Sequence, residues 1–239
     1  MKILDLSLPT PEENLACDEA LLDRCEEDDP AGILRFWESR EHFLVLGYSN
    51  KMRSEIKPLS AEGNGLRVLR RPSGGGAVLQ GPGCLNYALI LRIPSSGPLT
   101  SITRTNCHVM TRHRDALAPL LGGKVEVRGT SDLVLGDLKF SGNAQRRKRS
   151  AILFHGTFLY GMDFERMEKH LAMPSLEPDY RNGRPHGAFV ANLPLSPAQI
   201  KKALQETWNA FEPLEDYPRE RVARLVRDKF SRQEWNSKF

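Results

Sequence analysis

The chain has 239 residues, 40% of them hydrophobic and 27% charged, and a formal net charge of +4. These values are typical of a soluble globular protein that is long enough to bury a core. The mild positive charge does not indicate nucleic-acid binding, and no apolar run is long enough to cross a bilayer. Residues 1–8 contain an acidic residue, so they predict a first strand rather than a signal peptide.

The four cysteines form no C-x-x-C pair and show no zinc-like spacing to a histidine. The simplest interpretation is a cytoplasmic protein with unpaired thiols. Cys17 and Cys25 fall in an apparent helix, where we expect them to be core residues.

The pattern of apolar residues predicts elements along the whole chain. Residues 12–27 have apolar positions at helical spacing between acids, which indicates an amphipathic helix. Further helices are expected over 51–63 (short), 103–121, 163–170, 196–211 and 219–230. Strands are expected over 33–37, 43–46, 66–69, 77–79, 85–93, 124–127, 133–135, 138–145 and 151–160, and an irregular loop over 177–187. Without repeats or a linker, residues 1–239 predict one α+β domain with a mixed, mostly antiparallel sheet.

A glycine loop follows two adjacent arginines over residues 70–78, with the sequence RRPSGGGAV. Glycines let a backbone approach a ligand closely, and consecutive N–H groups can bind an anion. Arginine adds a fork of donors suited to carboxylate or phosphate. The loop therefore predicts an anion site, although the same residues could form a flexible turn beside a solvated basic pair.

Lys139 precedes the small residues Ser141, Gly142, Asn143 and Ala144. Alternation along a strand places Lys139, Ser141 and Asn143 on one face, opposite Leu138 and Phe140. The small residues leave space beside the amine, as a ligand trough would need. The alternative is an ordinary solvent-exposed lysine, and His155 on the next strand could equally be a hydrogen-bonded core histidine.

The basic run Arg146-Arg147-Lys148-Arg149 lies between two predicted strands. Such a run is typical of a solvated hairpin tip. It could also be a docking edge for an acidic partner, because clustered positive charge steers association.

Three motifs, taken together and in order, resemble the lipoate–protein ligase family of the biotin/lipoate ligase superfamily. The family's basic pair followed by S-G-G-G-A-V matches residues 70–78, and N-D followed by K-x-S-G-x-A matches Ser131-Asp132 and residues 139–144. H-H-G-T-L-L matches residues 154–159. The likeness implies the family's fold, which is like that of class II synthetases, and it spans nearly the whole chain.

The resemblance implies an enzyme that activates lipoate with ATP, helped by Mg²⁺, to an acyl-adenylate. The lipoyl group then passes to a lysine of a lipoyl carrier domain, with neither nucleic acid nor membrane as partner. Lys139 would bridge the acyl carbonyl and the α-phosphate as a fixed positive charge, and residues near Phe36, Leu46 and Val78 would line the slot for the acyl tail. No metal ligand is assigned. The implied substrate- and nucleotide-binding residues are Arg70, Arg71, Ser73, Gly74, Gly75, Gly76, Ala77, Val78, Leu79, Asp132, Ser141, Gly142, Asn143, Ala144, His155 and Gly156.

The chain departs from the family pattern at three places. Gln80-Gly81 stands where His-Asp is common, Phe154 replaces one histidine, and Ser131 replaces asparagine. Many members also continue into a small accessory domain, so the resemblance implies either a separate accessory chain or a compact ligase. One alternative is an ATP-independent octanoyl or lipoyl transferase, which needs a cysteine thiolate. Residues 125–131 contain no cysteine, so Cys84 is the substitute that this alternative requires. A non-catalytic binder of lipoyl domains is the third interpretation.

Overall fold

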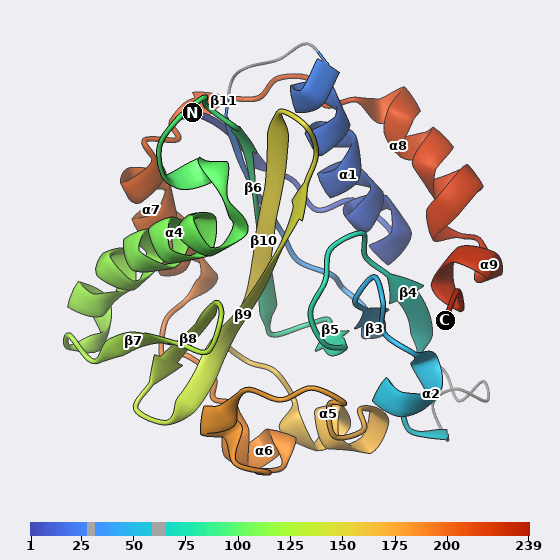
Figure 1. Ribbon diagram of the computed structural model, residues 1–239, viewed down its shortest axis with the longest axis vertical. Coiled ribbons are helices and arrows are strands. Elements are labelled where there is room, and N and C mark those ends of the chain that lie inside the picture. Colours follow the sequence, from blue (N-terminus) through green and yellow to red (C-terminus); the bar gives the residue numbers. More distant parts are fainter. Residues whose placement is uncertain (28–31, 59–65) are drawn as a thin grey trace.

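The computed structural model describes residues 1–27, 32–58 and 66–239. Within them, a large sheet has the strand order β11-β1-β2-β6-β10-β9-β8-β7 (Figure 1). Strand β1 runs parallel to β2 and β11, and the other neighbours are antiparallel, which confirms the prediction of a mixed, mostly antiparallel sheet. The strands are β1 (Lys2–Asp5), β2 (Ile33–Trp37), β6 (Cys84–Arg92), β7 (Val125–Arg128), β8 (Asp132–Leu135), β9 (Leu138–Arg147), β10 (Ala151–Leu159) and β11 (Glu212–Pro213).

A second, smaller sheet carries the glycine loop. Its order is β4 (Arg67–Arg70), β3 (Phe43–Leu46) and β5 (Val78–Gln80), with β3 parallel to β4 and antiparallel to β5. The loop 71–77 connects the two outer strands of this sheet, so both of its ends are fixed by strand pairing.

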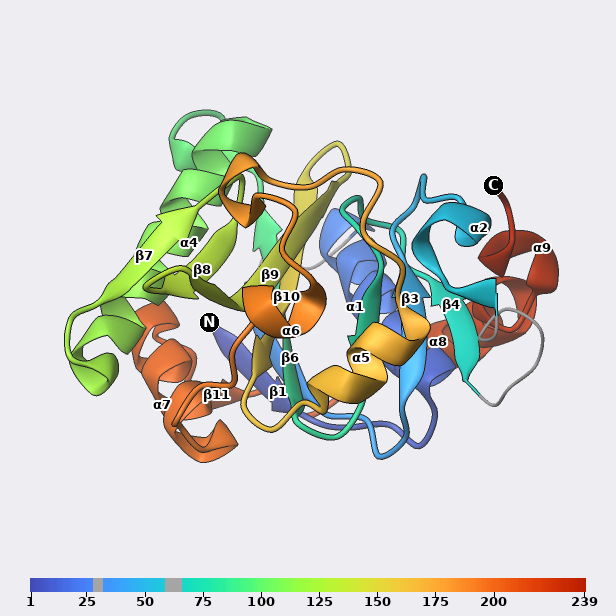
Figure 2. The ribbon, with the colours of Figure 1, turned by 90° about the horizontal axis from the view of Figure 1, so that it is seen from below.

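Helices cover both faces of the large sheet. In Figure 1, α4 and α7 lie on one face and α1 and α8 on the other. Figure 2 shows α5 and α6 in front, at the end of the sheet that is lowest in Figure 1. The described helices are α1 (Pro11–Glu27), α2 (Met52–Glu55), α4 (Ile102–Leu117), α5 (Phe164–His170), α6 (His186–Phe189), α7 (Pro197–Trp208), α8 (Arg219–Leu225) and α9 (Gln233–Asn236), with 3₁₀ turns at Pro98–Thr100, Ala118–Leu121 and Asp179–Arg181 and a π turn at Val226–Phe230.

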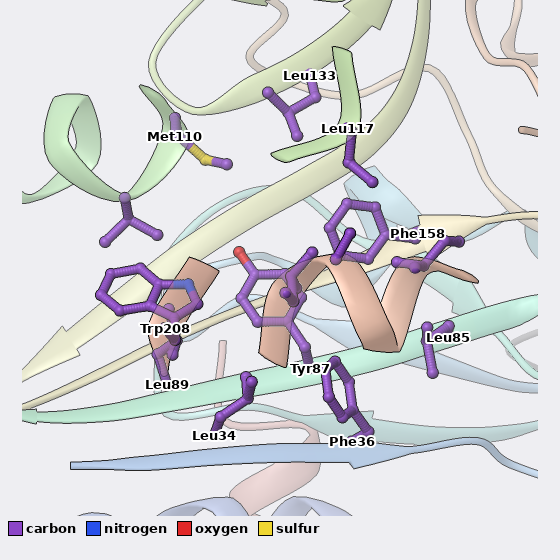
Figure 3. Packing of buried hydrophobic residues seen from close by; sticks show 14 of the residues in the cluster. Leu34, Phe36, Leu85, Tyr87, Leu89, Met110, Leu117, Leu133, Phe158 and Trp208 are labelled. Atoms are coloured by element: carbon purple, nitrogen blue, oxygen red, sulfur yellow. The ribbon is translucent and has the colours of Figure 1, made fainter. Parts of the chain in front are cut away.

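Strand β6 explains why the large sheet is buried on both faces. Leu85, Tyr87 and Leu89 pack in the core under α4 and α7, whereas Ala88 and Ile90 pack in the core under α1. Figure 3 shows Tyr87 among the side chains of the first core. Since successive strand residues face opposite sides, a nearly continuous apolar strand is what two covered faces require.

The predicted helices and strands are present, most of them with ends shifted by one to three residues, but the segment 177–187, expected to be irregular, contains the 3₁₀ turn Asp179–Arg181 and the start of α6. Asp163 and Ser196 cap α5 and α7 through their side chains, and Pro197 occupies the first turn of α7. The helix expected over 103–121 changes at Ala118 into a 3₁₀ turn that contains Pro119. The short helix expected within 51–63 is confirmed as Met52–Glu55, and residues 59–63 of that segment lie outside the described residues.

No helix in the described part of the chain is long and apolar enough to cross a membrane.

Candidate active site

A cavity of about 460 Å³ lies between the glycine loop, α1, the large sheet and the segment 174–190. Most residues predicted for the site line this cavity. They are Arg71, Gly75, Gly76, Ala77, Val78, Leu79, Asp132, Lys139, Ser141, Gly142, Asn143, Ala144, His155 and Gly156. The structure therefore brings together three segments that lie far apart in the sequence.

Arg71 holds the glycine loop in shape. Its guanidinium donates hydrogen bonds to the carbonyl oxygens of Gly74, at 2.6 Å, and Gly76, at 2.8 Å. Burial lowers the pKa of Arg71 to about 10, so the side chain remains charged at neutral pH. Gly75 has a φ of +90°, and a Cβ on Gly47 would lie 2.0 Å from the Gly75 carbonyl oxygen. Two backbones thus meet here at a distance that only glycine permits.

Arg70 does not line the cavity, contrary to the prediction. Adjacent residues in extended backbone point to opposite sides, so Arg70 turns away from Arg71 and is fully buried. Its guanidinium fastens the C-terminal segment to the turn after β3 by donating to five carbonyl oxygens, those of Gly47, Tyr48, Asn50, Trp235 and Asn236. Ser73 and Gly74 also stay outside the cavity lining.

Lys139 is paired with Asp132 at the cavity wall, and Tyr180 holds that carboxylate. Its Nζ lies 2.7 Å from Oδ1 of Asp132, and the Tyr180 hydroxyl donates to Oδ2 of the same carboxylate at 2.8 Å. Burial and the neighbouring Asp132 raise the pKa of Tyr180, which keeps the hydroxyl protonated as a donor. A Cβ on Gly142 would lie 2.9 Å from Nζ, so the ammonium occupies the space that glycine leaves.

The predicted alternation of β9 is confirmed with one exception. Lys139, Ser141 and Asn143 all line the cavity and Phe140 is fully buried in the core, but Leu138 is 36% exposed. The pairing of β9 with β8 shifts register between Leu133 and Val134. Leu138 lies beside the β8–β9 turn, where it leaves the core.

Asn143 links strand β9 to Ser131 and Tyr87 by hydrogen bonds at the cavity wall. Its amide donates to the Ser131 carbonyl oxygen at 2.6 Å and accepts from the Tyr87 hydroxyl at 2.6 Å. The bond to Ser131 fixes the residue before Asp132. A Cβ on Gly156 would lie 1.8 Å from Oδ1 of Asn143, which explains the glycine at this position.

His155 belongs to a buried polar chain that the sequence did not predict. Its Nε2 lies 2.6 Å from Oγ of Ser73, and its Nδ1 lies 3.6 Å from Oδ2 of Asp18. Asp18 is paired in turn with the fully buried Arg35, 2.5 Å away. Burial by itself would raise the pKa of Asp18, but Arg35 and His155 outweigh it and lower that pKa. The only sequence signal was Arg35, the single charged residue of the otherwise apolar strand β2, because Asp18 is one of several acids on α1.

The apolar part of the cavity is displaced by one residue from the predicted slot. Trp37 and Val45 line it together with Leu15, whereas Phe36 and Leu46 face the cores. Val78 lines the cavity as predicted. The prediction named residues near Phe36 and Leu46, and their neighbours Trp37 and Val45 are the ones that line the cavity. The sequence could not choose between neighbours, because a buried strand with two apolar faces gives no sign of which face meets the cavity.

No cysteine of the described chain lines the cavity. Cys84 is fully buried, and burial raises the pKa of its thiol far above the ordinary value. Cys17 and Cys25 are core residues as predicted, and burial raises the pKa of Cys17 to about 11. A thiolate nucleophile needs a lowered pKa and access to the substrate, and Cys84 has neither.

The basic run is only partly free for a partner. Arg147 belongs to β9 and donates to the Leu99 carbonyl oxygen at 2.8 Å, while Lys148 pairs with Asp23 at 2.7 Å. Arg146 and Arg149 are exposed. These two arginines are therefore the most accessible members of the run for another molecule, and Arg146 also lies over the Tyr48 ring, 6.0 Å from its centroid.

Among the described residues, no group of three or more His, Cys, Asp or Glu side chains could hold a metal ion by itself.

Residues 10–209 match the family model described as the lipoyl protein ligase A/B catalytic domain. The chain therefore belongs to this family, as its motifs predicted. It is 24% identical to lipoate–protein ligase 1 of Staphylococcus aureus, over 96% of this chain and 71% of that protein. It is also 30% identical to the octanoyltransferase LipM of Carboxydothermus hydrogenoformans, over 95% of this chain and 94% of that protein.

Solved structures show the same fold. A bi-partite lipoate protein ligase of Thermoplasma acidophilum, described with its E2 lipoyl domain, superposes with a TM-score of 0.81 at 24% identity, covering 99% of this chain and 95% of that one. A lipoate-protein ligase A bound with ATP superposes with a TM-score of 0.79 at 23% identity, covering 99% and 98%. The fold of the lipoate ligases is thus confirmed for this chain.

Proposed function

We propose that this protein activates lipoate with ATP and transfers the lipoyl group to a lysine of a lipoyl carrier domain. The observation that carries the proposal is the Lys139 ammonium, which faces a cavity whose lining contains no described thiol. A fixed cation suits a reaction in which negative charge gathers on a carboxylate and a phosphate. A transfer through an acyl-cysteine would need a nucleophile that this cavity does not offer.

In the first step, a carboxylate oxygen of lipoate attacks the α-phosphate of ATP, and pyrophosphate leaves. Lys139 would bind both the attacked phosphate and the carboxylate, which lowers the repulsion between the two anions. Asp132, which is itself held by the Tyr180 hydroxyl, holds the ammonium in place before the substrates arrive. In the second step, the neutral amine of the carrier lysine attacks the acyl carbonyl, an amide forms and AMP leaves.

The lining suggests where each substrate part would bind. The side chains of Leu15, Trp37 and Val45 form an apolar region suited to the acyl tail. Ala77, Leu79 and the neighbouring loop backbone, which belong to the family's glycine motif, would contact the nucleotide.

Magnesium carried by the triphosphate would need only one or two protein carboxylates. Asp132 fits such a role, because it is the carboxylate beside Lys139 and each of its oxygens can accept more than one partner.

We also propose that residues 1–239 act as one catalytic domain. The C-terminal segment is tied into the small sheet by Arg70 and by Asn236, whose Oδ1 accepts from the Arg70 amide. The partner would be the carrier domain, and a separate accessory chain would assist activation if the isolated protein is slow in that step. The Thermoplasma ligase, named as bi-partite, supports a division of this kind.

The experiment offers the purified protein two donors for an apo carrier domain, namely lipoate with ATP and Mg²⁺, or premade lipoyl-adenylate. Intact mass of the carrier reports acylation. We expect acylation from both donors, with a loss of at least about 100-fold in Lys139→Ala when ATP is the source, since removing one stabilising group of this kind costs that much. Acylation from the adenylate alone would indicate that an accessory chain is required. Unchanged ATP-dependent acylation in Lys139→Ala would refute the assignment.

The second candidate is an ATP-independent octanoyltransferase, and the similarity to LipM favours it. It predicts transfer from an octanoylated carrier without ATP and loss of that transfer in Cys84→Ala. We expect neither, because the Cys84 thiol is fully buried away from the cavity lining.

A further inference from the structure

Three buried polar atoms at the cavity have no hydrogen-bond partner among the described residues. They are Nε1 of Trp37, Oε1 of Gln80 and Nδ2 of Asn86. These residues are only 3%, 6% and 4% exposed, and all three line the cavity. A buried polar atom without a partner is destabilising, so in the working protein a ligand or water satisfies it.

Thr157 joins two of these residues into a chain. Gln80 donates to Oγ1 of Thr157 at 2.7 Å, and that hydroxyl donates to Oδ1 of Asn86 at 3.0 Å. If both side-chain amides are turned around, the hydrogen bonds of this chain run in the opposite direction, but the two amides still leave one donor and one acceptor without a partner. Together with the Trp37 N–H, the residues of the cavity wall therefore leave two donors and one acceptor without a partner in either orientation of the amides.

The strand register places this polar group at a defined distance from Lys139. Gly142 pairs with Thr157, Thr157 with Asn86 and Asn86 with Trp37, so one residue of each of four neighbouring strands forms a row. The Lys139 ammonium lies at Gly142, and Asn86 is two strands away, about 10 Å. An extended eight-carbon acid has a similar length. If its carboxylate meets Lys139, its far end reaches Asn86, and Trp37 lies on the next strand beyond.

We propose that Trp37, Gln80 and Asn86 form a polar end to the acyl slot, which selects medium-chain acids whose far end can form hydrogen bonds. The inference rests on the proposed function and specifies the kind of carboxylic acid that the enzyme would accept. Sulfur is a weak acceptor, so the dithiolane ring of lipoate can take the Trp37 and Asn86 donors. Octanoate ends in a methyl group and leaves all three polar atoms unpaired, which a site built from polar groups penalises.

The test is direct binding of three acids to the whole protein by titration calorimetry, without ATP or carrier. The acids are lipoate, octanoate and 8-hydroxyoctanoate, whose terminal hydroxyl both donates and accepts. We expect lipoate and 8-hydroxyoctanoate to bind more tightly than octanoate, by about fivefold for each hydrogen bond made. In a purely apolar slot the hydroxy acid would bind worst.

Two variants assign the effect to atoms. Trp37→Phe keeps a ring but removes the donor, so it should weaken lipoate and the hydroxy acid about fivefold and leave octanoate within about twofold. In the amide orientation described, Gln80→Met removes the unpaired acceptor and should weaken the hydroxy acid alone. This variant also serves as the test if Trp37→Phe folds poorly. Val45→Ala is the control, because a smaller wall residue should weaken all three acids alike.

The outcomes separate this inference from the proposed function. Octanoate binding as tightly as the other acids, or Trp37→Phe weakening all three equally, would overturn the polar end alone. The predicted order of affinities without any ATP-dependent acylation would support the polar end and count against the proposed function. Failure of every acid to bind would overturn both.

Discussion

Replacing Asp18 should destabilise the protein strongly, although Asp18 lies outside every sequence motif. Its partner Arg35 is fully buried, and Asp18 itself is 2% exposed. Removing one member of a buried pair leaves an uncompensated charge and costs about 3–5 kcal/mol. We expect Asp18→Asn near the lower value, because the amide still accepts one bond from Arg35, and Asp18→Ala near the upper one.

Urea denaturation followed by circular dichroism measures this loss. For a chain of this size, the same free energy lowers the melting temperature by roughly 6–20 °C. The matched control is the surface pair of Arg67 and Glu12, 3.0 Å apart, in which the Arg67 side chain is 52% exposed. Arg67→Ala should cost no more than about 1 kcal/mol.

The pH dependence supplies an independent check. Because folding lowers the pKa of Asp18, its contribution is present above the ordinary value of 3.8 and is lost as the pH falls through the lower folded value. The difference between wild type and Asp18→Asn should therefore be constant near neutrality and shrink only in strong acid. If Asp18→Asn were no less stable than the Arg67→Ala control, the buried chain would have no structural role and the reasoning would fail.

Two further tests each compare substitutions of the same residue type for which the structure predicts different effects. In Gly142→Ala the new Cβ would lie 2.9 Å from the flexible end of a lysine, so stability should fall by less than about 1 kcal/mol while carrier acylation drops. In Gly156→Ala the new Cβ would lie 1.8 Å from Oδ1 of Asn143, whose amide is fixed by hydrogen bonds, so urea denaturation should show a loss of about 1–3 kcal/mol in the free energy of unfolding. Equal losses of stability in the two glycine variants would contradict both predictions. Arg146→Ser and Arg149→Ser should weaken carrier binding and flatten its dependence on salt. Arg147→Ser should lower stability instead. If the salt dependence of carrier binding were unchanged in Arg146→Ser and Arg149→Ser, these two arginines would have no role in docking the carrier.

The sequence was sufficient to predict most of the larger elements, but not the short elements β11, α6 and α9, and it predicted most of the residues that line the cavity. Short apolar strands bounded by turn residues, as at Phe43–Leu46, leave a local signal, and so do caps such as Asp163 and Ser196. The glycine loop and the Lys139 strand could be brought together only through the resemblance, because nothing local relates segments some seventy residues apart.

Other features depend on pairings that no local pattern records. Arg70 and Arg71 look alike in the sequence, yet one fastens the C-terminal segment and the other holds the glycine loop. The Asp18–Arg35 pair joins a helix to a strand, and Tyr180 reaches Asp132 from the short 3₁₀ turn Asp179–Arg181. Each of these contacts is set by tertiary packing, which is why sequence reasoning missed the partners.

The most direct test of the proposed reaction is lipoate-dependent release of pyrophosphate from ATP, measured with the purified protein and, in parallel, with a candidate accessory chain added. The account predicts release that requires lipoate and is abolished in Lys139→Ala, in at least one of the two samples. Carrier acylation that proceeds without ATP and without pyrophosphate release would contradict it.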